Sequence, residues 1–207
     1  MHPFSTYLLL TLLGSMAGCA SLSKDQCLNG NWQQIGFADG TRGLPPDQLN
    51  EHAKACSEYG VQTNFEQYML GRSRGLINYC QPQNAFNIGR AGQGENMAAC
   101  PPNMQDAFLF EFRRGGEINQ MESELEALRS RISANNSRIY RNDGRISDIR
   151  NELRRTDLSN EARNALLNEF NRLVDEKNFL IRENGFVQRD ADRRYDTIVM
   201  RLREFGK

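Results

Sequence analysis

The stretch "INQMESELEALRSRISANNSRIYRNDGRISDIRNEL", residues 118–153, decides the fold of this 207-residue chain. Its aliphatic residues and two asparagines recur in alternating steps of three and four positions. They are Ile118, Met121, Leu125, Leu128, Ile132, Asn135, Ile139, Asn142, Ile146, Ile149 and Leu153. This heptad pattern is typical of the buried seam of a coiled coil. We therefore expect one long helix whose seam packs against a second helix.

A second heptad seam follows after a short break. The segment "RRTDLSNEAR", residues 154–163, interrupts the first pattern, and Ser159 within it has the residue type of a helix N-cap. The second seam consists of Leu166, Phe170, Leu173, Lys177, Leu180, Asn184, Val187, Ala191, Arg194, Ile198 and Arg201. A short break between seams of similar length favours an antiparallel hairpin within one chain. Pairing of these helices between chains remains the alternative, and the oligomeric state is left open.

Polar residues within the two seams predict their register. In one antiparallel register Asn135 faces Asn184 and Asn142 faces Lys177, while aliphatic residues face one another elsewhere. An unpaired buried amide costs roughly 1 to 3 kcal/mol, so polar residues placed opposite one another would fix this register. We expect each helix to be about 55 to 65 Å long, at 1.5 Å per residue.

Composition changes sharply near Gly115 and Gly116. All five Cys, all six Pro and the single Trp precede this pair, whereas Glu, Arg, Asn and aliphatic residues dominate after it. The sequence therefore predicts a helical head domain over residues 27–116 and a coiled-coil hairpin over residues 117–207. The 26 basic and 26 acidic side chains balance, which argues against a nucleic-acid partner.

The N-terminus has the features of a signal peptide. Residues 1–18 contain no Asp, Glu, Lys or Arg, and their apolar run is too short to cross a bilayer. The following "SMAGC" resembles the lipobox of bacterial lipoproteins, in which the Cys is acylated with fatty acids such as palmitate. That residue would be Cys19, although Met16 stands where the lipobox usually has Leu. Ordinary cleavage after Ala20 is the alternative.

This resemblance implies a location. Residues 19–26 would form a lipidated tether, and Ala20 is not the Asp that retains lipoproteins in the inner membrane. We therefore expect the chain to be anchored in the cell outer membrane by its N-terminal lipid and to face the periplasm.

The four remaining cysteines predict two disulfides in such an oxidising compartment. The sequence favours helices near residues 30–42, 47–60 and 65–80 in the head domain. In a tight hairpin of the last two helices, Cys56 and Cys80 would lie beyond disulfide reach. Pairing of Cys27 with Cys56 and of Cys80 with Cys100 is therefore favoured. We expect no metal site, because there is no Cys-x-x-Cys and His52 is the only His after residue 18.

Glycines recur in three similar segments of the head domain. They are "IGFADG" at 35–40, "LGRSRG" at 70–75 and "IGRAGQG" at 88–94. We interpret Gly71 and Gly75, one helical turn apart, as a place where two helices pack closely, with Tyr68 and Leu76 in the core beside them. The alternative is an anion or partner contact, with Trp32, Tyr68, Arg72, Arg74 and Arg90 as its side chains. Thr63 and Glu66 are expected to form a capping box for the helix that carries Gly71.

These segments carry a family resemblance. "NWQQIGFADGTRG" at 31–43, "HAKACSEYGV" at 52–61, "YMLGRSRGLINYC" at 68–80 and "NAFNIGRAGQG" at 84–94 resemble the successive motifs of domain-of-unknown-function family 2799, a set of Gram-negative envelope lipoproteins. The resemblance covers residues 27 to 116. It implies a lipidated, Cys-containing periplasmic domain followed by a helical tail, and it implies no activity.

The motifs of common enzymes are missing from the sequence. No G-x-x-x-x-G-K-[ST] or G-x-S-x-G is present, and "GRAGQG" does not match the dinucleotide-binding fingerprint. His52 lies in a charged helix, where a solvated surface position is expected. We therefore predict an all-α protein without cofactor or catalytic residues, which binds an envelope protein through its coiled coil. The alternative is a small-ligand or cell-wall-glycan binding module that uses the head domain.

Overall fold

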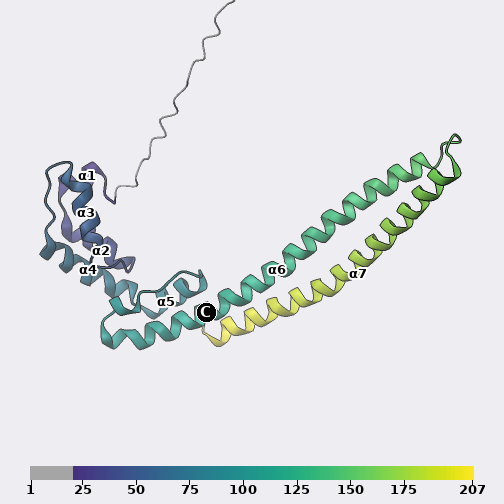
Figure 1. Cartoon of the computed structure of the whole chain (residues 1–207). Coiled ribbons are helices and arrows are strands. Elements are labelled where there is room, and N and C mark those ends of the chain that lie inside the picture. Colours follow the sequence, from purple (N-terminus) through teal and green to yellow (C-terminus); the bar gives the residue numbers. More distant parts are fainter. Residues whose placement is uncertain (1–20) are drawn as a thin grey trace, which may run out of the picture. The chain divides into compact units, whose positions relative to one another are not determined.

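A computed structural model describes residues 21–207, and the predicted signal peptide and Cys19 lie outside this range. The described residues form seven α-helices and one 3-10 helix, with no strand among them, which confirms the all-α prediction (Figure 1). The helices are α1 (Lys24–Asn29), α2 (Trp32–Thr41), α3 (Gln48–Ser57), α4 (Phe65–Tyr79), α5 (Pro82–Arg90), η1 (Met97–Ala99), α6 (Pro102–Glu152) and α7 (Asn160–Glu204). None of the helices between residues 21 and 207 combines the length and the apolar character that a membrane span needs.

The chain divides into two compact units. Unit 1 contains the described residues up to Cys80 together with Ala98–Pro101, and unit 2 contains Gln81–Met97 together with Pro102–Lys207. The boundary expected after residue 116 therefore falls inside α6, which continues without interruption through Gly115 and Gly116. Helix α5, expected in the head domain, belongs to unit 2 because it packs along the first part of α6.

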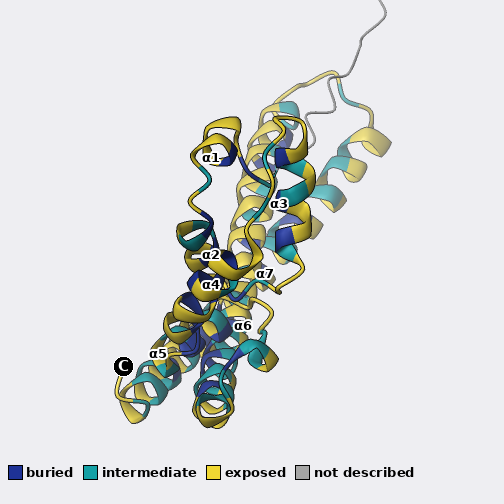
Figure 2. Ribbon diagram, turned by 90° about the vertical axis from the view of Figure 1, so that its left-hand side faces the viewer, coloured by how far each residue is buried: buried dark blue, intermediate teal, exposed yellow. Residues whose placement is uncertain are grey.

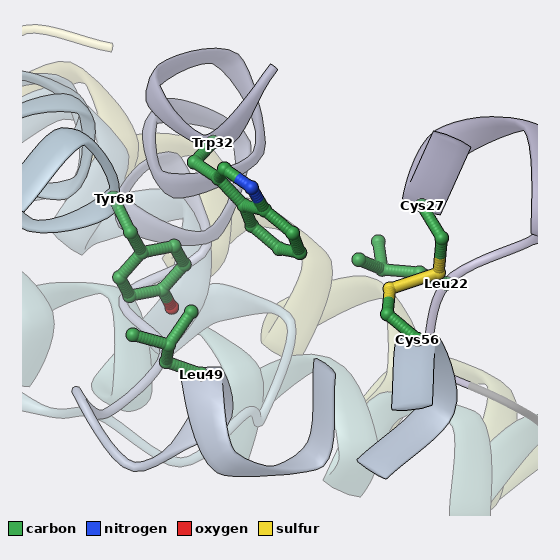
Figure 3. Packing of buried hydrophobic residues seen from close by; sticks show 6 residues of the cluster. All are labelled: Leu22, Cys27, Trp32, Leu49, Cys56 and Tyr68. Atoms are coloured by element: carbon green, nitrogen blue, oxygen red, sulfur yellow. A yellow bond between two sulfur atoms is a disulfide. The ribbon is translucent and has the colours of Figure 1, made fainter. Parts of the chain in front are cut away.

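The core of unit 1 forms around a disulfide. Cys27 of α1 and Cys56 of α3 are bonded, with their Cα atoms 5.3 Å apart. Figure 3 shows this bond beside the buried side chains of Leu22, Trp32, Leu49 and Tyr68. The predicted second bond is also present: Cys80, after α4, is bonded to Cys100. Both predicted pairings are confirmed.

Helices α2 and α4 pack backbone to backbone at their glycines. A Cβ atom on Gly71 would lie 1.9 Å from the carbonyl oxygen of Gln33, and one on Gly36 would lie 2.0 Å from that of Tyr68. No other residue type fits at such a distance, because carbon and oxygen repel strongly below about 3 Å. The predicted close helix packing at Gly71 and Gly75 is therefore confirmed, with the "IGFADG" segment as its partner.

Unit 2 repeats this arrangement between α5 and α6. A Cβ on Gly89 would lie 2.1 Å from the carbonyl oxygen of Phe112, and one on Gly115 would lie 2.0 Å from that of Phe86. The glycine segment at 88–94 thus packs against α6 at Gly115 and Gly116, where the sequence predicted a domain boundary. Gly115 marks a close helix crossing inside a continuous helix, not a linker.

The ends of the long helices are set by side-chain caps. Ser159 accepts a hydrogen bond from the backbone N–H of Ala162 (3.2 Å) and starts α7 as predicted. Helix α4 begins at Phe65 as expected, but its N-cap is Asn64, whose side chain accepts a hydrogen bond from the backbone N–H of Gln67 (2.9 Å). The expected capping box of Thr63 and Glu66 is therefore wrong. An Asn side chain serves as well as Thr at this position.

Candidate functional site

Helices α6 and α7 form the predicted hairpin within one chain, and their register is the predicted one. The amide Nδ2 of Asn135, which is 7% exposed, donates to Oδ1 of Asn184 over 2.9 Å. Toward the turn, the expected apolar partners share one cluster, which contains Ile146, Ile149, Leu153, Leu166, Phe170 and Leu173. Each helix buries a narrow stripe and leaves most of its surface exposed or half-buried (Figure 2).

The predicted pairing of Asn142 with Lys177 differs in detail. Lys177 forms an ion pair with Asp143, the neighbour of Asn142, over 2.5 Å. A lysine in a seam position extends its apolar stem past the seam and places the ammonium group at the solvent edge. The carboxylate at that edge therefore becomes its partner.

One flank of the hairpin is closed by ion pairs. The α6 side consists of five charged residues spaced seven apart: Glu117, Glu124, Arg131, Arg138 and Arg145. Each pairs with an oppositely charged residue of α7, respectively Arg201, Arg194, Glu183, Glu176 and Glu169. We call this the ion-pair flank. Exposed pairs add little stability one by one, but the α6 side changes from acidic to basic between Glu124 and Arg131 and the α7 side changes in the opposite sense, which specifies how α6 and α7 face each other.

The opposite flank of the seam is apolar on α7. Leu167, Val174, Ile181, Tyr195 and Leu202 recur every seven residues, with Gln188 in the remaining place. We call this row the apolar flank. Leu167, Ile181 and Tyr195 are 42%, 50% and 53% exposed. In heptad geometry they lie on the side of the seam away from the ion-pair flank. Such a row is unusual on a helix whose other face is already packed.

Helix α6 lines the same side with arginine and tyrosine. A hollow of about 620 Å³ is bordered by Arg129 of α6 and by Tyr195 and Leu202 of α7. A second one, of about 540 Å³, is bordered by Arg129, Tyr140 and Arg141, and the Tyr140 side chain is 82% exposed. Neither Arg129 nor Arg141 forms an ion pair with any residue in the described part of the chain. This side of the hairpin therefore offers an apolar row beside Arg129, and Glu122 and Glu126 border the same hollow as that arginine.

Unit 1 contains a buried polar cluster centred on Asp39, which the sequence did not indicate. Oδ2 of Asp39 lies 2.7 Å from Nε2 of His52 and accepts a hydrogen bond from the Tyr68 hydroxyl over 2.9 Å. Arg42 pairs with the other carboxylate oxygen. Asp39 and His52 are each 1% exposed. The expectation that His52 lies at the surface is therefore wrong: its ring faces the core because Asp39 satisfies it there.

The environment of Asp39 keeps it ionised. Burial alone would raise the pKa of the Asp39 carboxyl, but the hydrogen bonds from His52, Arg42 and Tyr68 outweigh burial and lower the pKa below its usual value. Burial and the hydrogen bond to this carboxylate raise the pKa of the Tyr68 phenol well above its usual value.

The same cluster includes the first described residue. Oγ of Ser21 lies 2.9 Å from Nδ1 of His52, so both ring nitrogens of His52 have partners. A Ser–His–Asp sequence of contacts is thus present. However, the imidazole is buried, and Nε2, the usual proton acceptor from the serine, faces the aspartate instead. We interpret the cluster as structural.

The five residues considered for a ligand contact do not form one site. Trp32 and Tyr68 belong to the core of unit 1, at 5% and 0% exposed. Arg72 is also buried, and its Nε donates to the carbonyl oxygen of Leu44 over 2.9 Å. Arg74 is exposed beside a shallow hollow of about 420 Å³. Arg90 belongs to unit 2, where it pairs with Glu122 over 2.6 Å.

The described part of the chain also lacks a site for a metal ion, because no three His, Cys, Asp or Glu side chains gather closely enough between residues 21 and 207. The fold thus defines an all-α protein built from a disulfide-bonded unit with glycine-crossed helices and a long coiled-coil hairpin. Residues 31–117 match the model of the family described as "Protein of unknown function (DUF2799)". The match ends where the regular seam begins. No curated protein and no solved structure matches the chain.

Proposed function

We propose that this protein is a non-enzymatic lipoprotein of the outer membrane that binds another envelope protein along its coiled-coil hairpin. The observation that supports the binding role most strongly is the difference between the two flanks of the hairpin. A hairpin that served only as a spacer would need neither an apolar row nor unpaired arginines outside its own seam.

The surface has the chemistry of a helix-binding face. An amphipathic helix laid along the hairpin would cover the apolar flank of α7 with its own apolar residues. An acidic residue of that helix would pair with Arg129 of α6, which has no ion-pair partner among the described residues. We therefore assign the occupant as an amphipathic helix of a partner protein, which would complete a three-helix bundle.

Most of the residues considered for the alternative role, a ligand-binding head domain, are buried. Trp32 and Tyr68 are core side chains, and Arg72 is held by a backbone carbonyl. An aromatic platform for a sugar must present an open ring face, which neither ring does.

Anchoring and location are supported by the N-terminal sequence. Cys19 follows a signal-peptide pattern, and Ala20 after it favours the outer membrane. Two disulfides fit an oxidising compartment such as the periplasm.

Site-specific photo-cross-linking in living cells tests the binding role. Benzoylphenylalanine would replace Tyr195 on the apolar flank, or its exposed neighbour Asp196 as the matched control. We expect one discrete protein adduct from position 195 and little or none from position 196. Ile181→Glu, which places a charge in the middle of the apolar flank without touching the seam, should remove the adduct.

Two outcomes would contradict the proposal. Equal adducts from positions 195 and 196 would show that the apolar flank is not the binding face. An adduct that consists of two copies of this chain would show that the flank mediates self-association instead.

A further inference from the structure

The first described residues are part of the folded core of unit 1. Leu22 is 7% exposed and packs with Trp32 and the Cys27–Cys56 disulfide (Figure 3). Immediately before it, Ser21 lies 2.9 Å from the ring of the buried His52. The chain is therefore fixed to unit 1 from Ser21 onward, and no flexible segment follows that residue before the core.

This attachment leaves very little chain between the fold and the expected anchor. Cys19 precedes Ser21 by two residues, and a chain extends by at most about 3.6 Å per residue. The Cα atom of Cys19 is therefore no more than about 7 Å from that of Ser21. This inference rests on the proposed acylation of Cys19. With those acyl chains in the bilayer, so short a connection holds unit 1 directly against the membrane surface.

The neighbouring surface of unit 1 has the residues of a membrane interface. Lys24 and Leu28 are one turn apart on α1, and Nζ of Lys24 lies 5.8 Å from the ring centroid of Tyr59. Leu28 is 56% exposed and Tyr59 is 39% exposed. Tyrosine rings and lysine ammonium groups favour the headgroup region, while an exposed leucine gains by entering the acyl boundary.

We propose that Lys24, Leu28 and Tyr59 form a seating patch that rests in the headgroup region of the membrane and orients unit 1 on it. We assign a lipid surface as the partner of this patch because only a short stretch of chain connects the patch to the acylated cysteine. Lys24 follows Ser21 by three residues, so the patch begins within about 18 Å of chain from the acylated cysteine. A protein could not occupy the space between them without removing the anchor from the bilayer.

Quenching by brominated lipids tests this orientation. The lipidated full chain would be purified from membranes and reconstituted in vesicles of phosphatidylglycerol and acyl-brominated phosphatidylcholine. A tryptophan would be placed by Leu28→Trp, or by Ile77→Trp as the matched control, since Ile77 is 50% exposed on α4. Tyr68, near the start of α4, packs in the same core as Leu22 and Cys27, whereas Ile77 lies about two and a half turns further along α4. The native Trp32 is 5% exposed and provides the background.

We expect the tryptophan at position 28 to be quenched at least about threefold more than the one at position 77. Eight Gly and Ser residues inserted between Ala20 and Ser21 should reduce this difference, because they separate the anchor from the fold. Equal quenching at both positions in protein that carries its acyl chains would overturn the seating patch and leave the proposed anchor intact. A mass spectrum without acyl chains would overturn the anchor, and the seating with it.

Discussion

The close crossing of α2 and α4 makes Gly71 the position where one methyl group has the largest predicted effect. A Cβ atom there would lie 1.9 Å from the carbonyl oxygen of Gln33 and 2.9 Å from the backbone nitrogen of Phe37. Ordinary contact begins near 3.5 Å, so Gly71→Ala requires the helices to separate by about 1.5 Å. Overpacking of this kind costs about 1 to 3 kcal/mol, and the obstacle is backbone, which cannot rotate away.

The higher helix propensity of alanine acts in the opposite direction but is smaller, at most about 1 kcal/mol. We therefore expect Gly71→Ala to destabilise unit 1 by about 2 kcal/mol and to lower its melting temperature by about 8 to 16 °C. Fluorescence of Trp32 measures this unit selectively, because it is the only tryptophan and is buried there. A local probe is needed because two units need not unfold in one step.

Gly144 provides the matched control. It lies inside α6, about two turns before the end of the helix, and a Cβ built on it would have no atom within 4 Å outside its own helical turn. Gly144→Ala should therefore stabilise the hairpin by up to about 1 kcal/mol, measured by circular dichroism. A Gly→Ala substitution is therefore expected to lower the free energy of unfolding at position 71 and to raise it at position 144. A Gly71→Ala protein that unfolds at the wild-type urea concentration or above it would refute the backbone contact between α2 and α4.

Three further predictions concern the other structural features. The pKa of Asp39 in the folded protein lies below its unfolded value of about 3.9. The ionised Asp39 therefore stabilises the fold above about pH 4, and this contribution is lost as the pH falls through the pKa of the folded state. Trp32 fluorescence should show that wild type loses more stability than Asp39→Asn between pH 5 and pH 3, and parallel pH profiles would contradict this. Asn135→Leu alone should destabilise the hairpin by about 1 kcal/mol, because Oδ1 of Asn184 loses the hydrogen bond that it accepts from Asn135. Adding Asn184→Leu should restore the loss in circular-dichroism melts. Replacing Cys27 and Cys56 by serine should lower the free energy of unfolding of unit 1 by about 3 to 4 kcal/mol in urea. The melting of α6 and α7 should stay unchanged, and a lower stability of both units would show that their unfolding is coupled.

The hairpin could be predicted almost completely because its interactions repeat at a fixed interval. Apolar residues seven apart specify which faces meet, and two asparagines at matching distances from the turn specify the register. Helix length excluded a Cys56–Cys80 disulfide, and of the two connectivities that remained, the favoured one, between cysteines adjacent in sequence, is the one present. The glycine crossing at Gly71 was also visible, because two glycines one turn apart in a helix have few other uses.

The interior of unit 1 could not be predicted in the same way. Asp39, His52 and Tyr68 meet across separations of 13 and 29 residues, from three short helices whose packing has no sequence period. Each looks like an ordinary surface or ligand-binding residue by itself. A charged neighbourhood in the sequence therefore suggested an exposed His52, and the sequence offered both a core position and a ligand site for Tyr68.

The sequence by itself determined the all-α class, the hairpin with its register, the two disulfides and the close approach of helices at glycine. These features depend on the spacing of residues along one or two regular helices, and that spacing can be read from the sequence. Only the tertiary structure decided that the units divide after Cys80, that Ser21 is held by His52, and that Trp32 and Arg72 are interior. It also showed which seam neighbours stay uncovered, leaving an apolar flank opposite the ion pairs. Burial depends on all the elements that pack around a residue, and no single stretch of sequence contains that information.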